Sequence, residues 1–174
     1  MITRKSILIV SLLVVFTALS CKREPEPGPA PAKSVDEEMY ELATNTAGFI
    51  WYKHSDALLP KSSGSGHNAP SLRTRYNATA ATMLDVDGKV QAGAVFPEGS
   101  LIVKELVDGS TTTRYAILLK RSGHEAADAR GWVWGYLNAD GSVAEPAANK
   151  GNICTGCHSQ DGNIDYMLMN KFFP

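Results

Sequence analysis

The middle of the chain alternates between apolar and polar positions, which is the pattern of half-buried β-strands. The clearest strand covers residues 100–107, and after a turn at Asp108-Gly109 the alternation resumes over 111–120, so the two segments predict an antiparallel hairpin. A further strand is expected over 131–137, where three aromatic residues at every second position share one side, and a shorter one over 72–76. The central region therefore predicts an antiparallel sheet.

A helix is expected before these strands. Ser34 and Glu37 form a capping box, in which the two side chains satisfy backbone N–H groups of the first turn. The predicted helix extends to about Ala47, or as far as Leu59. Its expected inward-facing residues are Met39, Leu42, Ala43, Phe49, Ile50 and Tyr52.

Shorter helices are expected elsewhere in the chain. The alanine-rich segment 78–84 predicts one short helix, and residues 154–160 and 165–172 predict two more near the C-terminal end. The fold class is therefore α+β, with an antiparallel β-sheet flanked by an N-terminal helix and by C-terminal helices.

Residues 1–20 have the features of an export signal. Arg4 and Lys5 precede an apolar run over 7–19, which is short for a membrane span but suits the core of a signal peptide. The run ends in Ala18-Leu19-Ser20-Cys21, which resembles a bacterial lipoprotein cleavage box, although such boxes usually carry Leu at the position of Ala18. Either Cys21 becomes the lipidated first residue of the mature protein, or an ordinary signal peptide precedes a chance cysteine.

Residues 21–33 are rich in proline and predict an extended spacer between the membrane and a single folded domain, residues 34–174. The formal net charge of the whole chain is −1, and removal of the leader with its two basic residues makes the mature chain more acidic. No basic patch is present in the sequence. Nucleic acid is therefore excluded as an expected partner, and contact with a membrane is expected only through the lipid anchor.

The clearest chemical motif is Cys154-Thr155-Gly156-Cys157-His158, the attachment signature of a c-type haem. Two thiols at this spacing reach the two vinyl groups of one porphyrin, and the following histidine is placed to ligate the iron. The alternatives are a redox cysteine pair followed by a chance histidine, or half of a zinc site, for which no second ligand pair is evident. The motif predicts one covalent haem c per chain, held by the C-terminal helices, with Cys154, Cys157 and His158 as its binding residues and His158 as the metal ligand.

Lys104 is unusual within the strongest predicted strand. On its own side of the strand it lies between Ile102 and Leu106, and burial among apolar residues lowers the pKa of a lysine and leaves a neutral, nucleophilic amine. The alternative is a lysine on an edge strand whose ammonium reaches water.

The remaining histidines carry weaker signals. His67 lies in the Gly- and Ser-rich loop 62–68, from which it can reach a site, but a solvent-exposed loop histidine is the favoured interpretation. His54 and His124 are interpreted in the same way.

Three segments together resemble the cytochrome P-460 family: residues 96–105 (FPEGSLIVKE), the strand sequence Trp132-Val133-Trp134, and the haem motif followed by Asp165-Tyr166. The resemblance covers roughly residues 70–174. It implies an exported bacterial mono-haem cytochrome with a largely antiparallel β fold, typically a homodimer. The family includes enzymes that oxidise hydroxylamine, and relatives called cytochromes c′-beta that bind nitric oxide and similar gases.

The resemblance also implies roles for particular residues. Lys104 matches the lysine that the enzymes join covalently to a haem meso carbon, and Arg73, with Arg75 as the alternative, matches an arginine of the distal pocket. Glu145 is the one candidate for a distal carboxylate just before the haem motif. Lys104, Arg73 and Glu145 are thus the expected catalytic residues. A small nitrogen-containing ligand or substrate and a redox-partner cytochrome are the expected partners, in the periplasm or on the outer surface of a bacterial cell.

The position of the haem motif near the C-terminus bears on the sixth ligand of the iron. Only sixteen residues follow His158, among them Met167 and Met169, and an intervening helix would keep both sulfur atoms from the far side of the haem. An open sixth position is therefore expected. Three functions remain: a haem oxidoreductase of the hydroxylamine-oxidising type, a gas-binding cytochrome without turnover, and, least favoured, an electron carrier.

Overall fold

The computed structural model describes residues 32–174 of the 174-residue chain. The predicted signal peptide, the lipidated Cys21 and most of the proline-rich spacer lie outside the described residues.

The N-terminal helix begins as predicted but ends earlier. Helix α1 covers Val35–Thr44, and its capping box is formed: the backbone N–H of Glu37 donates to Ser34 Oγ over 3.3 Å, and Ser34 N–H donates to Glu37 Oε2 over 2.8 Å. The extension to Ala47 or Leu59 is wrong. Asn45 is extended and Gly48 has a φ of 75°, so the helical path stops there, and strand β1 follows at Ile50–Trp51.

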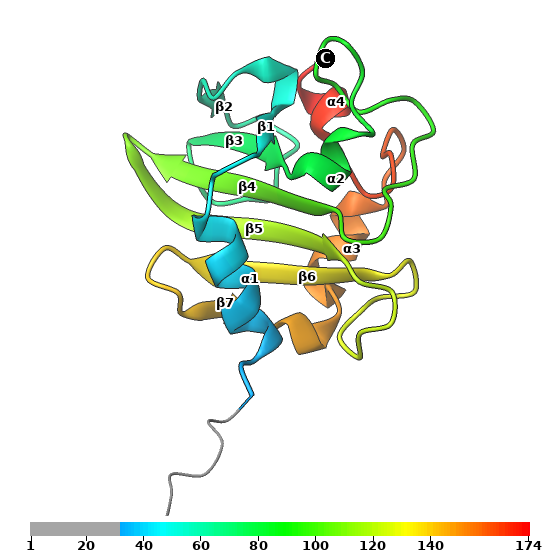
Figure 1. Ribbon diagram of the computed structural model, residues 1–174. Helices are drawn as coiled ribbons and strands as arrows, with labels where there is room; N and C mark the ends of the chain where they lie inside the picture. Colours follow the sequence, from blue (N-terminus) through cyan, green and yellow to red (C-terminus); the bar gives the residue numbers. More distant parts are fainter. Residues whose placement is uncertain (1–31) are drawn as a thin grey trace, which may run out of the picture. The chain divides into compact units, whose positions relative to one another are not determined.

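All four predicted strands are present in one antiparallel sheet (Figure 1). In the described residues the sheet has seven strands, in the order β1-β3-β4-β5-β6-β7 with β2 also paired to β3, which confirms the α+β class. The strands are β1 Ile50–Trp51, β2 Leu59–Pro60, β3 Ser71–Tyr76, β4 Leu101–Asp108, β5 Thr111–Lys120, β6 Trp132–Asn138 and β7 Val143–Glu145.

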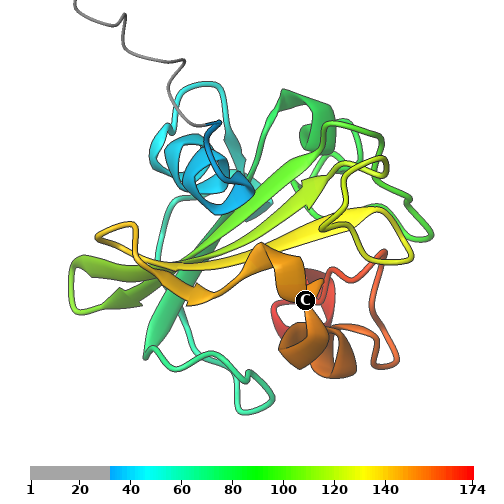
Figure 2. The same ribbon diagram turned by 90° about the horizontal axis from the view of Figure 1, so that it is seen from below.

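The sheet separates two apolar cores. One core lies between the sheet and α1 and contains Met39 and Ala43 of that helix, which are buried as predicted. The other core lies on the opposite face and contains the indoles of Trp132 and Trp134 on β6, together with the C-terminal Met167. Figure 2 shows α1 on one face of the sheet and the C-terminal helices on the other.

The remaining helices are short. They are η1 Tyr52–His54, α2 Ala78–Ala81, η2 Ala147–Asn149, α3 Asn152–His158 and α4 Met169–Phe172. The predicted helix over 165–172 exists only as its last turn, because Asp165 and Tyr166 have positive φ angles of 46° and 73° and form a tight turn instead. Within residues 32–174, none of the helices has the length and apolar character needed to cross a membrane.

Candidate functional site

Helix α3 carries the whole predicted attachment motif and lies close against β6. The helix follows two left-handed residues, Lys150 with a φ of 52° and Gly151 with a φ of 69°. A Cβ atom at Gly151 would lie 2.5 Å from the indole of Trp134. Glycine is therefore required at this position both for its backbone angle and for the close approach of helix to sheet.

His158 ends α3 with its imidazole in a fixed orientation. Its Nδ1 atom lies 2.8 Å from the backbone carbonyl oxygen of Tyr166. A carbonyl only accepts hydrogen bonds, so Nδ1 carries the proton and Nε2 keeps its lone pair. Burial, together with the nearby positive charge of Lys104, lowers the pKa of His158 to about 4. The ring is therefore neutral at pH 7, and no residue of 32–174 forms a hydrogen bond with Nε2. A carbonyl that accepts the proton of the other ring nitrogen is typical of histidines that ligate metals.

Two aromatic rings pack against this imidazole. The indole of Trp134 meets the His158 ring edge-on with centroids 5.2 Å apart, and it meets the Tyr166 ring at 5.1 Å. The indole itself is held because Trp134 Nε1 donates to Asp128 Oδ2 over 2.8 Å. These contacts restrict rotation of the histidine about its side-chain bonds.

The two thiols of the motif are free and differ in exposure. Cys154 is half-buried and Cys157 is exposed. Burial raises the pKa of the Cys154 thiol to about 11, and the carboxylate of Glu145 adds to the shift. Among residues 32–174, no three His, Cys, Asp or Glu side chains lie close enough together to hold a metal ion, whereas a structural zinc site requires four ligands.

A hollow lies between α3 and the sheet face that carries Lys104. Its walls are mainly apolar, and Lys104, Cys154 and His158 are among its lining residues. The other lining residues are His67, Thr74, Ile102, Ala116, Ile117, Leu118, Trp134, Gly135, Tyr136, Met167, Leu168 and Met169. Two further hollows share His67 and His158 with it, and both are also lined by Cys157.

Lys104 lines this hollow, and the prediction from the sequence that it lies among apolar residues is confirmed. It pairs with Thr74 on one side and Ala116 on the other, in the middle of the sheet and not at its edge. In the described part of the chain no carboxylate lies within ion-pair distance of its ammonium group. Burial lowers its pKa to about 8, well below the usual 10.5.

His67 lies inside the site, so the interpretation of a solvent-exposed loop histidine is wrong. The loop folds back over the hollow, and the His67 ring centroid is 6.2 Å from that of His158 and 5.8 Å from that of Tyr136. Burial lowers the pKa of His67 to about 3, with Lys104 and His158 contributing. Local sequence around His67 shows only a loop, and its packing depends on partners 69 and 91 residues away.

The other two histidines are not part of the site. His54 is exposed, and its Nε2 lies 3.2 Å from the carbonyl oxygen of Val86. His124 is half-buried rather than exposed, because its Nδ1 accepts a hydrogen bond from the backbone of Ala126 in a turn.

Arg73 and Arg75 do not reach the hollow, which corrects the prediction that either lies in a pocket with Lys104. Strand alternation places both on the opposite face of the sheet. There Arg73 Nε pairs with Glu105 Oε2 over 2.6 Å, and Arg75 pairs with the other oxygen of the same carboxylate. Both guanidinium groups also stack on Trp51.

Glu145 is also outside the group of residues that line the hollow. It ends β7 opposite Tyr136 and accepts a hydrogen bond from Asn149 Nδ2 over 2.9 Å. Its charge acts on the Cys154 thiol rather than on the cavity beside Lys104. The predicted role as a distal carboxylate therefore has no support in this arrangement.

Met167 and Met169 are both buried in the lining of the hollow. The reason for expecting them to be kept away was wrong, since residues 159–168 form turns and not an intervening helix. The sulfur of Met169 accepts a hydrogen bond from Thr74 Oγ1 over 3.3 Å.

Comparisons with family models, with curated proteins and with solved structures find no match for this chain. The resemblance to the cytochrome P-460 family accordingly stays a prediction from the sequence.

Proposed function

We propose that this chain is an exported c-type mono-haem protein whose iron, held by His158, binds or acts on a small nitrogen-containing molecule such as nitric oxide or hydroxylamine. The observation that carries the proposal is the hydrogen bond from His158 Nδ1 to the Tyr166 carbonyl, which leaves Nε2 as a free metal ligand beside an apolar hollow.

The donor set fits a covalent haem. Cys154 and Cys157 lie three residues apart on α3, so both thiols are available on one helix to form thioether bonds, and His158 follows directly. The haem would supply a redox-active iron that binds diatomic and other small ligands. The protein itself supplies the fixed imidazole, the largely apolar wall that excludes water, and two nitrogen-bearing side chains, Lys104 and His67, next to the ligand space.

The enzymatic form of the proposal, a hydroxylamine-oxidising oxidoreductase, is favoured by one specific observation. Lys104 faces the hollow without a carboxylate partner among the described residues, so its amine is available to a group bound there. Joining its Nζ atom to a porphyrin carbon replaces one N–H and one C–H bond by an N–C bond and is a two-electron oxidation, which hydrogen peroxide would balance by taking up both hydrogens and becoming two molecules of water. The non-catalytic, gas-binding form leaves this amine free. An electron carrier, which would need the sulfur of Met167 or Met169 as a sixth ligand, is the form that the sequence favours least.

The remaining parts of the proposal rest on the sequence. Export, lipidation at Cys21, a periplasmic or outer-surface location, a redox-partner cytochrome and a homodimer all follow from the leader and from the family resemblance. Arg73 and Glu145 are no longer included among the proposed catalytic residues.

Absorption spectra of the protein, produced with haem-attachment machinery, test these forms. A ferrous protein with an open position binds carbon monoxide and nitric oxide with a shift of the Soret band, whereas a six-coordinate carrier does not respond. A Lys104→Met variant separates the other two forms. If Lys104 is joined to the haem, the variant has a Soret band well to the blue of wild type and loses hydroxylamine-dependent reduction of an acceptor dye. Equal Soret positions exclude the cross-linked enzyme, and no response to either gas excludes the proposed ligand-binding site.

A further inference from the structure

The turn after α3 has a backbone conformation that its sequence does not favour. Ile164 and Met167 exchange two backbone hydrogen bonds of 2.8 Å around Asp165 and Tyr166, which have φ angles of 46° and 73°. Two consecutive positive φ angles define a type I′ turn, for which Asn-Gly is the preferred sequence. Aspartate tolerates this region, but tyrosine rarely adopts it. Contacts outside the turn must therefore hold it.

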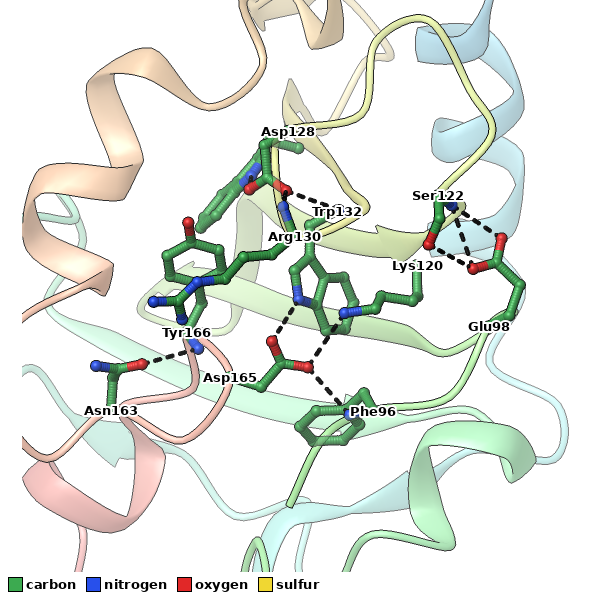
Figure 3. Close-up of polar contacts among 11 residues, drawn as sticks. Phe96, Glu98, Lys120, Ser122, Asp128, Arg130, Trp132, Asn163, Asp165 and Tyr166 are labelled. Carbon is green, nitrogen blue, oxygen red and sulfur yellow. Dashed lines mark hydrogen bonds and ion pairs between the residues drawn. The ribbon is translucent and has the colours of Figure 1, made fainter. Parts of the chain in front are cut away.

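The side chain of Asp165 provides such contacts (Figure 3). Its Oδ2 accepts the backbone N–H of Phe96 over 3.0 Å and pairs with Lys120 Nζ at 3.3 Å, while Oδ1 accepts Trp132 Nε1 over 3.1 Å. The side chains of Asp165 and Lys120 are only 7% and 9% exposed. One carboxylate thus ties the turn to the loop before β4 and to strands β5 and β6.

The other residue of the turn faces the site. The Tyr166 carbonyl accepts the hydrogen bond from His158 Nδ1, and its ring packs between Trp134 and the guanidinium of Arg130, which lies 4.3 Å from the ring centroid. The Tyr166 N–H donates to Asn163 Oδ1 over 3.2 Å. The direction of the Tyr166 carbonyl is set by its backbone angles, so it depends on the turn that Asp165 holds.

We propose that Asp165 is a positioning residue for His158: its carboxylate holds the 164–167 turn, and the turn holds the carbonyl that keeps the His158 proton on Nδ1. The role rests on the proposed function in one respect, namely that Nε2 is the iron ligand. The arrangement of Asp165, Tyr166 and His158 itself belongs to the chain without any cofactor.

Two variants and a control test this role. Asp165→Ala removes all three contacts. The double variant Asp165→Asn with Tyr166→Gly replaces the anchored turn by Asn-Gly, which adopts the same conformation without help. Glu98→Gln is the control, because Glu98 accepts hydrogen bonds from the N–H and hydroxyl of Ser122 in the same region but touches no residue of the turn.

The first measurement is the ring ¹⁵N NMR spectrum of His158 in the full-length chain prepared without haem. Asp165→Ala is expected to lower the ratio of the Nδ1–H to the Nε2–H tautomer by roughly five- to tenfold, the value of one hydrogen bond. The double variant is expected to return the ratio toward wild type, and Glu98→Gln to leave it unchanged. This readout does not depend on haem attachment, so it decides the role of Asp165 even if the proposed function fails.

The second measurement uses the haem-loaded protein. The iron–histidine stretching frequency of the ferrous protein is expected to fall in Asp165→Ala and to recover in the double variant, because the carbonyl raises the basicity of the ligand. Near-ultraviolet circular dichroism confirms that each variant is folded, and if Asp165→Ala is unfolded the double variant alone is compared with wild type. An unchanged tautomer ratio in folded Asp165→Ala, or a double variant that lacks the wild-type ratio, overturns the proposal.

Discussion

Two adjacent residues of β4, Lys104 and Glu105, point to opposite faces of the sheet. They differ in whether an oppositely charged side chain lies beside them. On the α1 face, Glu105 pairs with both Arg73 and Arg75, and the Arg75 guanidinium also donates to the Ala43 carbonyl of α1. On the α3 face, the half-buried Lys104 lines a hollow and has no carboxylate within ion-pair distance among the described residues.

The charges of the Glu105 cluster stabilise the fold, whereas the nitrogen-bearing side chains at the hollow are left available to a ligand. A buried guanidinium is tolerated when its carboxylate is present, and removing that partner is far more costly than the net value of the pair. Burial lowers the pKa of His67 to about 3 and that of His158 to about 4, so both rings are neutral at pH 7, and it lowers the pKa of Lys104 to about 8. The hollow on the α3 face therefore presents two neutral imidazoles and the amine of Lys104 to an apolar space, while the buried ion pair of this face, Lys120 with Asp165, involves none of these three residues.

The largest effect is expected from breaking the paired face. Glu105→Gln leaves Arg75, which has no exposed surface, without a negative partner, and should lower the free energy of unfolding by about 3–5 kcal/mol in urea denaturation. Glu38→Gln is the control, because its pair with Arg121 is roughly 35–40% exposed and should contribute less than about 1 kcal/mol. Equal losses in the two variants would show that the burial of the Glu105 cluster has no energetic consequence.

Two glycines allow the packing of the faces to be compared. Gly151→Ala places a Cβ against the rigid indole of Trp134, at a position whose backbone is left-handed. It should lower the free energy of unfolding by about 2–3 kcal/mol. Gly135→Ala places a Cβ 2.8 Å from the terminal methyl of Met39 on the α1 face. Because the methionine side chain is flexible and can move, the free energy of unfolding should fall by only about 1 kcal/mol. Thermal unfolding measures both, and a larger loss for Gly135→Ala would contradict the close contact of α3 with β6.

The pH dependence of stability sharpens the comparison on the α3 face. The pKa of Lys104 is 10.5 in the unfolded chain and about 8 in the folded chain. Between these two pH values the unfolded state binds more protons than the folded state, so the free energy of unfolding rises with pH. Lys104→Met should therefore stabilise the haem-free chain by about 1 kcal/mol at pH 7, and this advantage should shrink as the pH approaches 10.

Urea denaturation of the Cys154→Ser/Cys157→Ser chain, with and without Lys104→Met, at pH 7, 8.5 and 10 measures this effect. The exposed Lys61 provides the control variant, Lys61→Met, whose effect on stability should not follow the same pH course. A difference between Lys104→Met and its parent that is constant with pH would mean that the ammonium is solvated in the folded state.

The sequence predicted the elements whose signals are local. The strand pattern, the capping box at Ser34 and the helix over Cys154–His158 are set by residues within a few positions of each other, and each is present at the expected place. Lys104 was found because its two strand neighbours are apolar. The end of α1 was predicted wrongly because the apolar pattern continues through Phe49 and Ile50, although the helix ends before Gly48.

Residues placed by long-range contacts were not predicted. The role of His67 depends on how a loop folds over a hollow, and that of Asp165 depends on partners from three other segments. Arg73 was assigned to the wrong face because a match to a motif fixes sequence position, whereas the side of the sheet is fixed by strand register.

The central claim is that the α3 face holds a covalent haem through Cys154 and Cys157. The most direct test is the intact mass of the purified protein under denaturing conditions, after production with haem-attachment machinery, compared with a Cys154→Ser/Cys157→Ser variant. The account predicts that wild type retains the mass of one haem after acidic acetone extraction and that the variant retains none. A wild-type chain that loses its haem to the solvent, or never carries one, would contradict it.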